Sequence, residues 1–457
     1  MSNALSDVSF WFDSVGDLPQ ADIAPLPDRL DVAIVGAGYT GLWTAYYLKQ
    51  REPGLRIGVF EAERVGFGAS GRNGGWCMGA AYGVQPLLDD PATRSRGVTL
   101  ARALFDTVDE VGRVCQAENI DAHYAKGGTL NVATIPFQVP YLKRHLEQLY
   151  RAGFSERDYQ WLPERESRAR LAMTPNHGAL YSLHCAALHP ARLVLGLADV
   201  VRRQGTHIYE GTPVNAIESG SIATQRGTVN AGAIIRATEG YTDTIEGQRR
   251  RLMPIYSMVT ATEPLPESLW QEIGLKERET FGDPRRLVIY GQRTLDNRLV
   301  LGGRAGYYFG SKRRRSIPPD DPKVVRVKAL VTKLFPMLEG YEITHGWGGL
   351  MGVPRHWRPC VQWDTRARTG WAGGYVGEGV GASNLAGRVM ADLVTGRATA
   401  LTELPWVNDQ GRRWEPEPLR FIGGKAIEFF GDRADRAEFA SGKRSKLWGG
   451  LFKRFVG

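Results

Sequence analysis

The sequence has few cysteines and no long apolar run, and each shortage excludes a class of protein. Its four cysteines, Cys77, Cys115, Cys185 and Cys360, are widely spaced along 457 residues. This spacing excludes a disulfide framework and a CxxC zinc or redox site, and it is typical of a reducing compartment. No stretch of about 18 apolar residues is available to span a bilayer, and the N-terminus lacks the basic and apolar regions of a signal peptide. We therefore expect a cytoplasmic protein.

Charge of one sign is not in large excess either. Lysine and arginine outnumber the acidic residues by 58 to 49, and the excess is concentrated at Arg249–Arg251, at Arg313–Arg315 and in the tail from Lys443 to Arg454. Because no nucleic-acid module or aromatic platform accompanies these residues, they indicate a solvated or anion-attracting surface and no nucleic-acid partner. The tail alternates basic with aromatic residues, a composition suited to weak contact with an anionic membrane. Gly449 and Gly450 weaken a helix there, so a frayed or packed terminus is the alternative.

Glycine is the residue type that the sequence has in excess. The 55 glycines make up about 12% of the chain, against a usual share of roughly 7%. They cluster in a few loops, which predicts close approach of the backbone to a ligand. The remaining composition, 42% hydrophobic and 23% charged, is that of a folded protein, and the length predicts one large domain or two to three intertwined domains.

A dinucleotide-binding pattern stands near the start of the chain. Residues 31–35 read DVAIV, as in a buried parallel strand, and GAGYTG follows at residues 36–41. A helical apolar pattern then runs to Pro53, and a second strand over residues 56–60 ends at Glu61. The order of strand, glycine turn, helix, strand and acid is more specific than a glycine motif alone.

Each residue of this pattern has a physical task. Gly36 permits the tight turn, Gly38 lets the backbone approach a pyrophosphate, and Gly41 lets the helix pack on the strand. The N-terminus of the helix offers N–H donors to the anion. Glu61 is spaced to accept hydrogen bonds from the ribose hydroxyls of an adenosine.

The loop that follows favours FAD over NAD. Residues 64–76 read RVGFGASGRNGGW, a run of small residues that lets a flat, bulky ring and a second phosphate lie against the backbone. Together, GAGYTGLWTA and GFGASGRNGG resemble the D-amino-acid oxidase-like (DAO) superfamily of FAD-dependent amine and amino-acid oxidoreductases. Within it, the chain resembles the branch around γ-glutamylputrescine oxidase and related aminophosphonate oxidoreductases. The resemblance covers roughly residues 8–400.

Two later segments match the family and complete the expected cofactor site. Residues 207–214 resemble the strand and turn whose last residue contacts adenine, and residues 232–242 resemble the strand that ends beside the pyrophosphate, with Glu239 and Gly240 departing from the family's Asn-Ala. Residues 371–384 resemble the glycine loop before the last helix, which Ser383 or Asn384 is expected to cap. The expected cofactor-binding residues are Gly36, Gly38, Tyr39, Thr40, Gly41, Glu61, Ala62, Gly68, Ala69, Ser70, Gly71, Arg72, Asn73, Gly74, Gly75, Val214, Ala237, Thr238, Gly377, Gly379 and Val380.

The motifs are scattered, so we expect an α/β fold with a discontinuous Rossmann-like FAD-binding domain and a second, mostly antiparallel β-sheet substrate domain. The expected boundaries are an N-terminal arm at 1–29, the FAD-binding domain at 30–95, 185–245 and 346–400, the substrate domain at 96–184 and 246–345, and a C-terminal extension at 401–457. Non-covalent FAD is expected, because Arg72 stands where histidyl-linked relatives have their histidine and Cys360 lies beyond the cysteinyl-linked position.

The resemblance implies transfer of a hydride from the carbon beside an amine nitrogen to flavin N5, followed by hydrolysis of the imine. No nucleophilic triad or metal site is expected. The candidate catalytic residues are Arg72, His345, Trp347 and Arg304. Arg72 and Asn73 are expected beside the flavin ring and His345 as a base, with a structural ion pair for Arg72 and a buried core histidine as the alternatives. Arg304 or Arg355 would bind an anionic substrate group.

The substrate and the electron acceptor stay open at this point. Tyr256, Tyr290 and Tyr307 are candidates for the pocket wall, with ordinary sheet packing as the alternative. Val300 stands where sarcosine-oxidase relatives carry an oxygen-activating lysine, so the acceptor is oxygen or another oxidant. A γ-glutamylated amine is the first expectation for the substrate. The alternatives are an amine or aminophosphonate dehydrogenase, an NAD(P)-dependent reductase, which the loop at 64–76 argues against, and a membrane-tethered flavoprotein partner.

Overall fold

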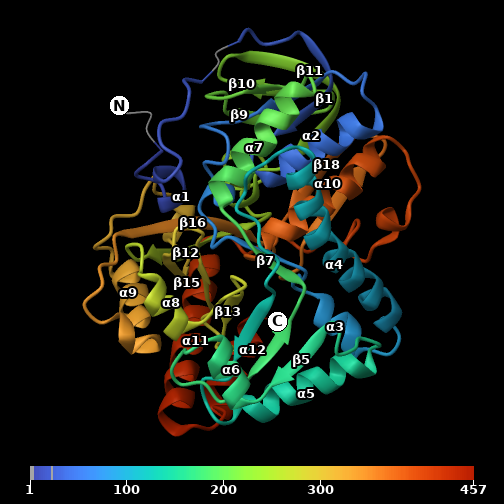
Figure 1. Cartoon of the computed structure of the whole chain (residues 1–457). Coiled ribbons are helices and arrows are strands. Elements are labelled where there is room, and N and C mark those ends of the chain that lie inside the picture. Colours follow the sequence, from blue (N-terminus) through green and yellow to red (C-terminus); the bar gives the residue numbers. More distant parts are fainter. Residues whose placement is uncertain (1–4, 22–23, 457) are drawn as a thin grey trace.

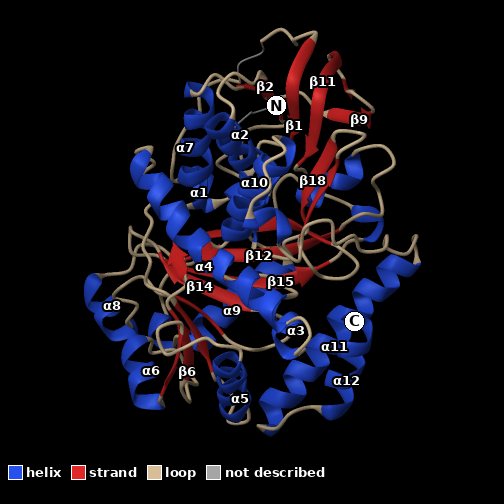
Figure 2. Cartoon of the chain, turned by 90° about the vertical axis from the view of Figure 1, so that its right-hand side faces the viewer, coloured by secondary structure: helices blue, strands red, loops and turns tan. Residues whose placement is uncertain are grey.

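Two eight-stranded sheets form the framework of the protein. The computed structural model describes residues 5–21 and 24–456. Figures 1 and 2 show the first sheet in the upper half of the molecule and the second sheet below it. A third, two-stranded antiparallel sheet pairs β3 (Trp76–Met78) with β7 (Cys185–Ala187). In the sequence, each of these two strands lies between a strand of one large sheet and a strand of the other. This arrangement confirms the expected α/β class with a second, mostly antiparallel sheet.

The first sheet is parallel at its centre, with the strand order β17-β18-β11-β1-β2-β8. Residues 32–35 of β1 are buried on both faces, as expected for a parallel strand that pairs with β11 and β2. β9 and β10 extend β11 as an antiparallel hairpin. The strands are β1 (Arg29–Val35), β2 (Ile57–Phe60), β8 (His207–Tyr209), β9 (Val214–Glu218), β10 (Ser221–Thr224), β11 (Gly227–Arg236), β17 (Cys360–Asp364) and β18 (Thr369–Gly373).

The second sheet has the order β16-β12-β15-β14-β13-β4-β6-β5 and is antiparallel except between β13 and β4. The long strands β12, β15 and β16 lie at the end of this sheet that is nearer the first sheet, as Figure 1 shows. The strands are β4 (Thr129–Val132), β5 (Tyr159–Leu162), β6 (Ala179–Ser182), β12 (Met253–Ala261), β13 (Thr280–Gly282), β14 (Ile289–Arg293), β15 (Leu299–Gly306) and β16 (His345–Val353).

Twelve α-helices in the described part of the chain pack around these sheets. Figure 1 shows α2, α7 and α10 around the first sheet and α8 and α9 beside the second. The helices are α1 (Phe10–Asp13), α2 (Tyr39–Arg51), α3 (Val84–Asp89), α4 (Arg94–Ala117), α5 (Gln138–Arg151), α6 (Glu164–Arg170), α7 (Pro190–Arg203), α8 (Glu267–Ile273), α9 (Pro322–Leu334), α10 (Gly379–Val394), α11 (Leu419–Ser441) and α12 (Lys446–Val456). None of these helices is both long enough and apolar enough to cross a bilayer.

The packing differs from the expected domain boundaries in two places. The apolar face of α4, assigned to the substrate domain, packs in the same core cluster as α2 and α10, through residues such as Leu104 and Val108. β16, assigned from residue 346 to the FAD-binding domain, pairs with β12 in the second sheet. Local sequence pattern predicts an element but does not state which neighbour it packs against.

Two helix ends also differ from expectation. α10 begins at Gly379 after Glu378, so Ser383 and Asn384 lie inside the helix instead of capping it, and the Ser383 hydroxyl donates to the Val380 carbonyl over 3.1 Å. The tail forms the continuous helix α12 despite its two glycines. A Cβ at Gly449 would lie 2.7 Å from a guanidinium nitrogen of Arg286, so the absence of a side chain permits this close contact.

Candidate functional site

A cavity of about 410 Å³ lies at the carboxyl ends of three strands of the first sheet, marked by Val35, Phe60 and Ala237. Open α/β sheets bind their ligands at this edge. The lining residues are Val35, Gly36, Gly38, Tyr39, Thr40, Phe60, Glu61, Ala62, Glu63, Phe67, Gly68, Ala69, Ser70, Asn73, Pro213, Val214, Asn215, Ala237, Thr238, Glu239, Tyr241, Thr244, Ile245, Arg313, Arg314, Arg315, Leu350, Met351, Tyr375, Gly377, Gly379, Val380 and Ser383. The structure therefore brings together all three chain segments expected to bind the cofactor.

The glycine turn between β1 and α2 can be built only with glycine at two of its positions. Gly36 has φ +108°, and a Cβ there would lie 2.6 Å from the Ala237 carbonyl oxygen. A Cβ at Gly41 would lie 2.0 Å from the Gly36 carbonyl oxygen, so Gly41 supports the turn without lining the cavity. Gly38 lies at the N-terminal end of α2, and the next residue, Tyr39, donates its N–H to the Ser70 hydroxyl over 2.9 Å.

Glu61 extends into the cavity from the end of β2. Its carboxylate accepts hydrogen bonds from the backbone N–H groups of Ala37 at 2.8 Å and Glu63 at 3.0 Å. Burial raises the pKa of this carboxyl to about 7, even though the two backbone hydrogen bonds act in the opposite direction. The carboxylate is therefore oriented before a ligand arrives, in the position expected for a ribose partner.

The loop that carries ASGRNGG contributes only part of its residues to the cavity. Gly68, Ala69, Ser70 and Asn73 line the cavity, whereas Gly71, Arg72, Gly74 and Gly75 do not. The glycines outside the lining permit close packing on the opposite side. A Cβ at Gly71 would lie 2.3 Å from the Phe12 ring, and a Cβ at Gly74 would lie 2.4 Å from the Tyr290 ring.

Five consecutive backbone carbonyls of this loop, from Gly71 to Gly75, accept hydrogen bonds from elsewhere in the chain. The donors are Ser9 Oγ at 2.7 Å, Trp347 Nε1 at 2.9 Å, Trp11 Nε1 at 2.7 Å, Gln292 Nε2 at 2.7 Å and Leu188 N at 2.9 Å, in the order of the carbonyls. Two of these donors lie in or next to the short helix α1. Trp347, expected near the flavin ring, therefore acts on the loop backbone and does not line the cavity.

Arg72 also lies outside the cavity lining, contrary to expectation. Its side chain is fully buried over the Phe67 ring, with the guanidinium carbon 4.4 Å from the ring centre. Nε donates to the Phe67 carbonyl and Nη1 to the Arg315 carbonyl, each over 2.7 Å. The position next to the loop is as expected, but the side chain points toward backbone carbonyls. Sequence adjacency does not determine that direction.

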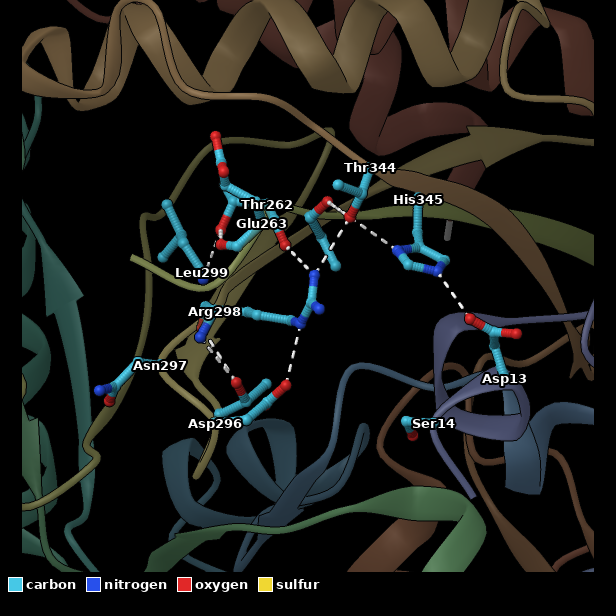
Figure 3. A network of polar contacts seen from close by, with 12 residues as sticks. Asp13, Ser14, Thr262, Glu263, Asp296, Asn297, Arg298, Leu299, Thr344 and His345 are labelled. Carbon is cyan, nitrogen blue, oxygen red and sulfur yellow. Dashed lines mark hydrogen bonds and ion pairs between the residues drawn. The ribbon is translucent and has the colours of Figure 1, made fainter. Parts of the chain in front are cut away.

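His345 lies at the edge of the second sheet, away from the cavity lining. Figure 3 shows its ring between Thr344 and Asp13, with Nδ1 2.7 Å from the Thr344 hydroxyl and Nε2 3.1 Å from the Asp13 carboxylate. The same network includes Arg298, which donates to the Thr262 carbonyl over 2.7 Å. This location does not support a role for His345 as a base and gives it a part in holding the N-terminal arm.

The remaining candidates lie in the second sheet or beyond it. Arg304 belongs to β15, and its side chain is outside the described part of the structure. Arg355 forms an ion pair with Glu415 at 3.2 Å and does not line the cavity. Tyr256, Tyr290 and Tyr307 are also absent from the lining, and their hydroxyls bond to the backbone N–H of Arg314, the hydroxyl of Ser257 and the carboxylate of Glu417, respectively.

Glu239 is a cavity residue whose side-chain role the sequence analysis missed. Its carboxylate accepts hydrogen bonds from the backbone N–H groups of Gly374 at 2.7 Å, Gly352 at 3.2 Å and Tyr375 at 3.3 Å. It thereby joins the turn after β11 to β16 and to the segment after β18. Burial raises its pKa to about 7. The departure from the family's Asn-Ala at this turn was the available signal.

The three arginines at 313–315, expected on a solvated or anion-attracting surface, line the cavity. Arg313 pairs with Asp243 at 2.6 Å and Arg315 pairs with Glu63 at 2.7 Å. The loop before α9 is thus tied to both sides of the cavity by ion pairs. A run of three arginines was visible in the sequence, but its acidic partners lie 70 and 252 residues away.

The residues present fit FAD. Glu61 would bind the adenosine ribose, Val214 the adenine, and the turn at 36–41 the pyrophosphate. The loop at 68–73 and the start of α10 would hold the ring system, because both bring small residues to the lining. Among the residues described, no group of three or more His, Cys, Asp or Glu side chains is placed to hold a metal ion.

Comparison with known proteins agrees with this geometry. Residues 31–393 match the family model of DAO, FAD dependent oxidoreductase. The chain is 32% identical to the gamma-glutamylputrescine oxidoreductase of Escherichia coli K12 over 86% of its own length and 91% of the relative's. It is 26% identical to the glycine oxidase of Geobacillus kaustophilus over 83% and 96%.

The fold is shared with solved structures of the same kind. The crystal structure of that glycine oxidase superposes with a TM-score of 0.69 at 23% identity, covering 84% of this chain and 100% of the other. L-proline dehydrogenase from P. horikoshii superposes with a TM-score of 0.66 at 17% identity, covering 83% and 96%. The chain therefore belongs to the DAO family of FAD-dependent oxidoreductases, which act on amines and amino acids.

Proposed function

We propose that the protein oxidises the C–N bond of a γ-glutamylputrescine-like amine. The observation that carries this proposal is the 32% identity to gamma-glutamylputrescine oxidoreductase over 86% of the chain. A match of that length includes the second sheet, whose strand β16 brings Leu350 and Met351 to the cavity lining. Removal of a hydride and a proton from the amine leaves an imine, and water converts the imine to an aldehyde and ammonia.

FAD, when bound, accepts the hydride, so the protein's own task is to bind, orient and exclude water. Leu350, Met351 and Tyr375 are among the apolar and aromatic side chains of the cavity lining. The Tyr375 hydroxyl lies 3.0 Å from the Thr40 hydroxyl, which fixes the ring against α2. α10 points its N-terminus at the cavity through Gly379, and a helix N-terminus stabilises nearby negative charge.

The second candidate is an amine or aminophosphonate dehydrogenase that uses an acceptor other than oxygen. Val300 favours it, because this residue is fully buried in the apolar cluster that contains Trp11 and Trp347. That position offers no cation to activate oxygen. We further propose a cytoplasmic location, supported by four cysteines that are all buried as free thiols.

An anaerobic titration of the purified holoprotein tests the proposal. We expect γ-glutamylputrescine to bleach the visible flavin band, and putrescine, glycine and an aminophosphonate to bleach it far more slowly. Rapid recolouring in air would identify an oxidase, and slow recolouring a dehydrogenase. Preferential bleaching by an aminophosphonate or by glycine would contradict the γ-glutamyl proposal.

Two arginine variants separate substrate binding from general damage. The prediction that Arg304 binds an anionic substrate group implies that Arg304→Ala raises the KM for γ-glutamylputrescine with little change in flavin content. Arg355→Ala is the matched control, because Arg355 pairs with Glu415 outside the cavity lining. Equal effects of the two substitutions would contradict an anchoring role for Arg304.

A further inference from the structure

The two C-terminal helices, α11 and α12, form a feature that the family assignment does not explain. The family match ends at residue 393, whereas these helices occupy residues 419–456. Figure 1 shows them in red, packed side by side at the end of the molecule opposite the first sheet. We refer to residues 419–456 as the C-terminal hairpin.

The inner side of the C-terminal hairpin is fixed to the second sheet's domain by its acidic residues. Arg286 pairs with Glu438 at 2.6 Å and with Asp435 at 3.4 Å. A Cβ at Gly431 would lie 3.2 Å from the Phe452 ring, so the two helices are in close contact. The hairpin is therefore a firmly placed element of the fold.

The other two acidic residues of the C-terminal hairpin are paired within α11. Glu428 bonds Lys425 at 2.6 Å, and Asp432 pairs with Arg436 at 2.8 Å. After Glu438 the sequence contains no acidic residue up to its end at 457. The outer side consequently carries no unpaired negative charge in the described part of the hairpin.

The outer side of the C-terminal hairpin is apolar and aromatic. Of the ten exposed large hydrophobic side chains in the described part of the chain, five belong to it, namely Leu419, Ile422, Phe429, Leu447 and Phe455. Leu447 is 66% exposed and Phe429 is 49% exposed. The rings form one cluster across both helices, with centroids 6.2 Å apart for Phe429 and Trp448 and 5.4 Å apart for Phe430 and Phe455.

Six exposed cations lie in the same hairpin, and one of them, Arg433, has its guanidinium carbon 5.3 Å from the centre of the Phe429 ring. None of them forms an ion pair with another described residue. They are Arg433, Lys443, Arg444, Lys446, Lys453 and Arg454. Exposed aromatic rings with lysine and arginine at their border are the chemistry that binds an anionic lipid surface, because the rings enter the headgroup region while the cations attract the phosphates.

We propose that the C-terminal hairpin docks the protein on an anionic lipid surface. A second copy of the chain fits less well, because a two-fold interface would bring two sets of unpaired cations face to face. The partner carries the negative charge that this side lacks. The docking places the enzyme on a membrane without insertion of a helix.

Flotation of the full-length holoprotein with lipid vesicles tests the proposal. We expect the protein to float with vesicles of phosphatidylglycerol and phosphatidylcholine, and to stay in the bottom fraction with phosphatidylcholine alone. The variant K446E/K453E/R454E is expected to bind the anionic vesicles at least about a hundredfold more weakly, because each lost cation removes about fivefold in binding and each new glutamate adds repulsion. Leu447→Ser, at the most exposed of these side chains, is expected to weaken binding with an unchanged flavin spectrum.

A matched control changes the same charge elsewhere. Arg96, Arg157 and Arg165 are exposed and form no ion pair with other described residues, so R96E/R157E/R165E should float as the wild type does. Equal loss in both triple variants, or flotation with phosphatidylcholine alone, would overturn the proposal. So would a dimer in solution that K446E/K453E/R454E dissociates, since this side would then be an interface between copies.

Discussion

Replacement of Trp11 by phenylalanine tests whether the N-terminal arm holds the cofactor loop in its binding conformation. Trp11 is 1% exposed, and its Nε1 donates to the Asn73 carbonyl over 2.7 Å. Phenylalanine keeps most of the buried apolar area but removes the donor. A buried carbonyl without its partner costs about 1 to 3 kcal/mol. If that cost falls on the conformation that binds FAD, the Kd for FAD rises about 5- to 150-fold.

The measurement is FAD binding to the apoprotein, followed by flavin fluorescence, together with the Tm of the apoprotein. Trp270→Phe is the matched control, since Trp270 is also fully buried and donates Nε1 to the Asn297 carbonyl over 3.0 Å, outside the cavity lining. Both substitutions should lower the Tm, and only Trp11→Phe should weaken FAD binding. A Kd within about twofold of the wild type for Trp11→Phe, with its Tm lowered as in the control, would refute the reasoning.

Three further predictions concern the cavity. Gly41→Ala places a Cβ 2.0 Å from a carbonyl oxygen of the glycine turn and should yield protein without FAD. The control Gly54→Ala, with no atom within 4 Å of its Cβ, should retain FAD. Equal flavin content in both variants would contradict a role of the turn in FAD binding. Burial raises the pKa of Glu61 to about 7, and hydrogen bonds from the ribose hydroxyls favour the ionised carboxylate. FAD binding should therefore release a proton, and the affinity for FAD should increase as the pH rises to about 7 and then level off. Calorimetry at several pH values checks this, and Glu61→Gln should remove the pH dependence. Arg315→Ala removes the ion pair with Glu63 and should speed FAD dissociation in a chase experiment. The free energy of unfolding should change by no more than about 1 kcal/mol. An unchanged dissociation rate would show that the ion pair does not retain the cofactor.

The nucleotide turn could be predicted from the sequence because its demands are local. A positive φ at Gly36 and the close contact at Gly41 require glycine at a fixed spacing, so the motif and the geometry correspond directly. The same holds for Glu61, which ends the second strand and lines the cavity. The mostly antiparallel second sheet was also predictable, since short β-branched runs alternate with turn residues.

The directions of side chains and the distant partners could not be predicted. Arg72 follows the cofactor loop in sequence, yet its guanidinium bonds to carbonyls of Phe67 and Arg315. His345 is the first residue of β16, but its partner Asp13 lies 332 residues away along the chain. Both outcomes depend on tertiary packing, which no local pattern contains.

The hydrogen bonds to the cofactor loop also have a consequence for biosynthesis. The donors come from residues 9, 11, 188, 292 and 347, so the loop at 71–75 gains its last side-chain partner only after three quarters of the chain has left the ribosome. The glycine turn at 36–41 emerges early, but at that stage the loop at 71–75 still lacks its hydrogen bonds from Gln292 and Trp347. The cavity lining also includes residues up to Ser383, so we expect cofactor loading late in synthesis or after it, and a chain truncated before Trp347 should leave the ribosome as an apoprotein.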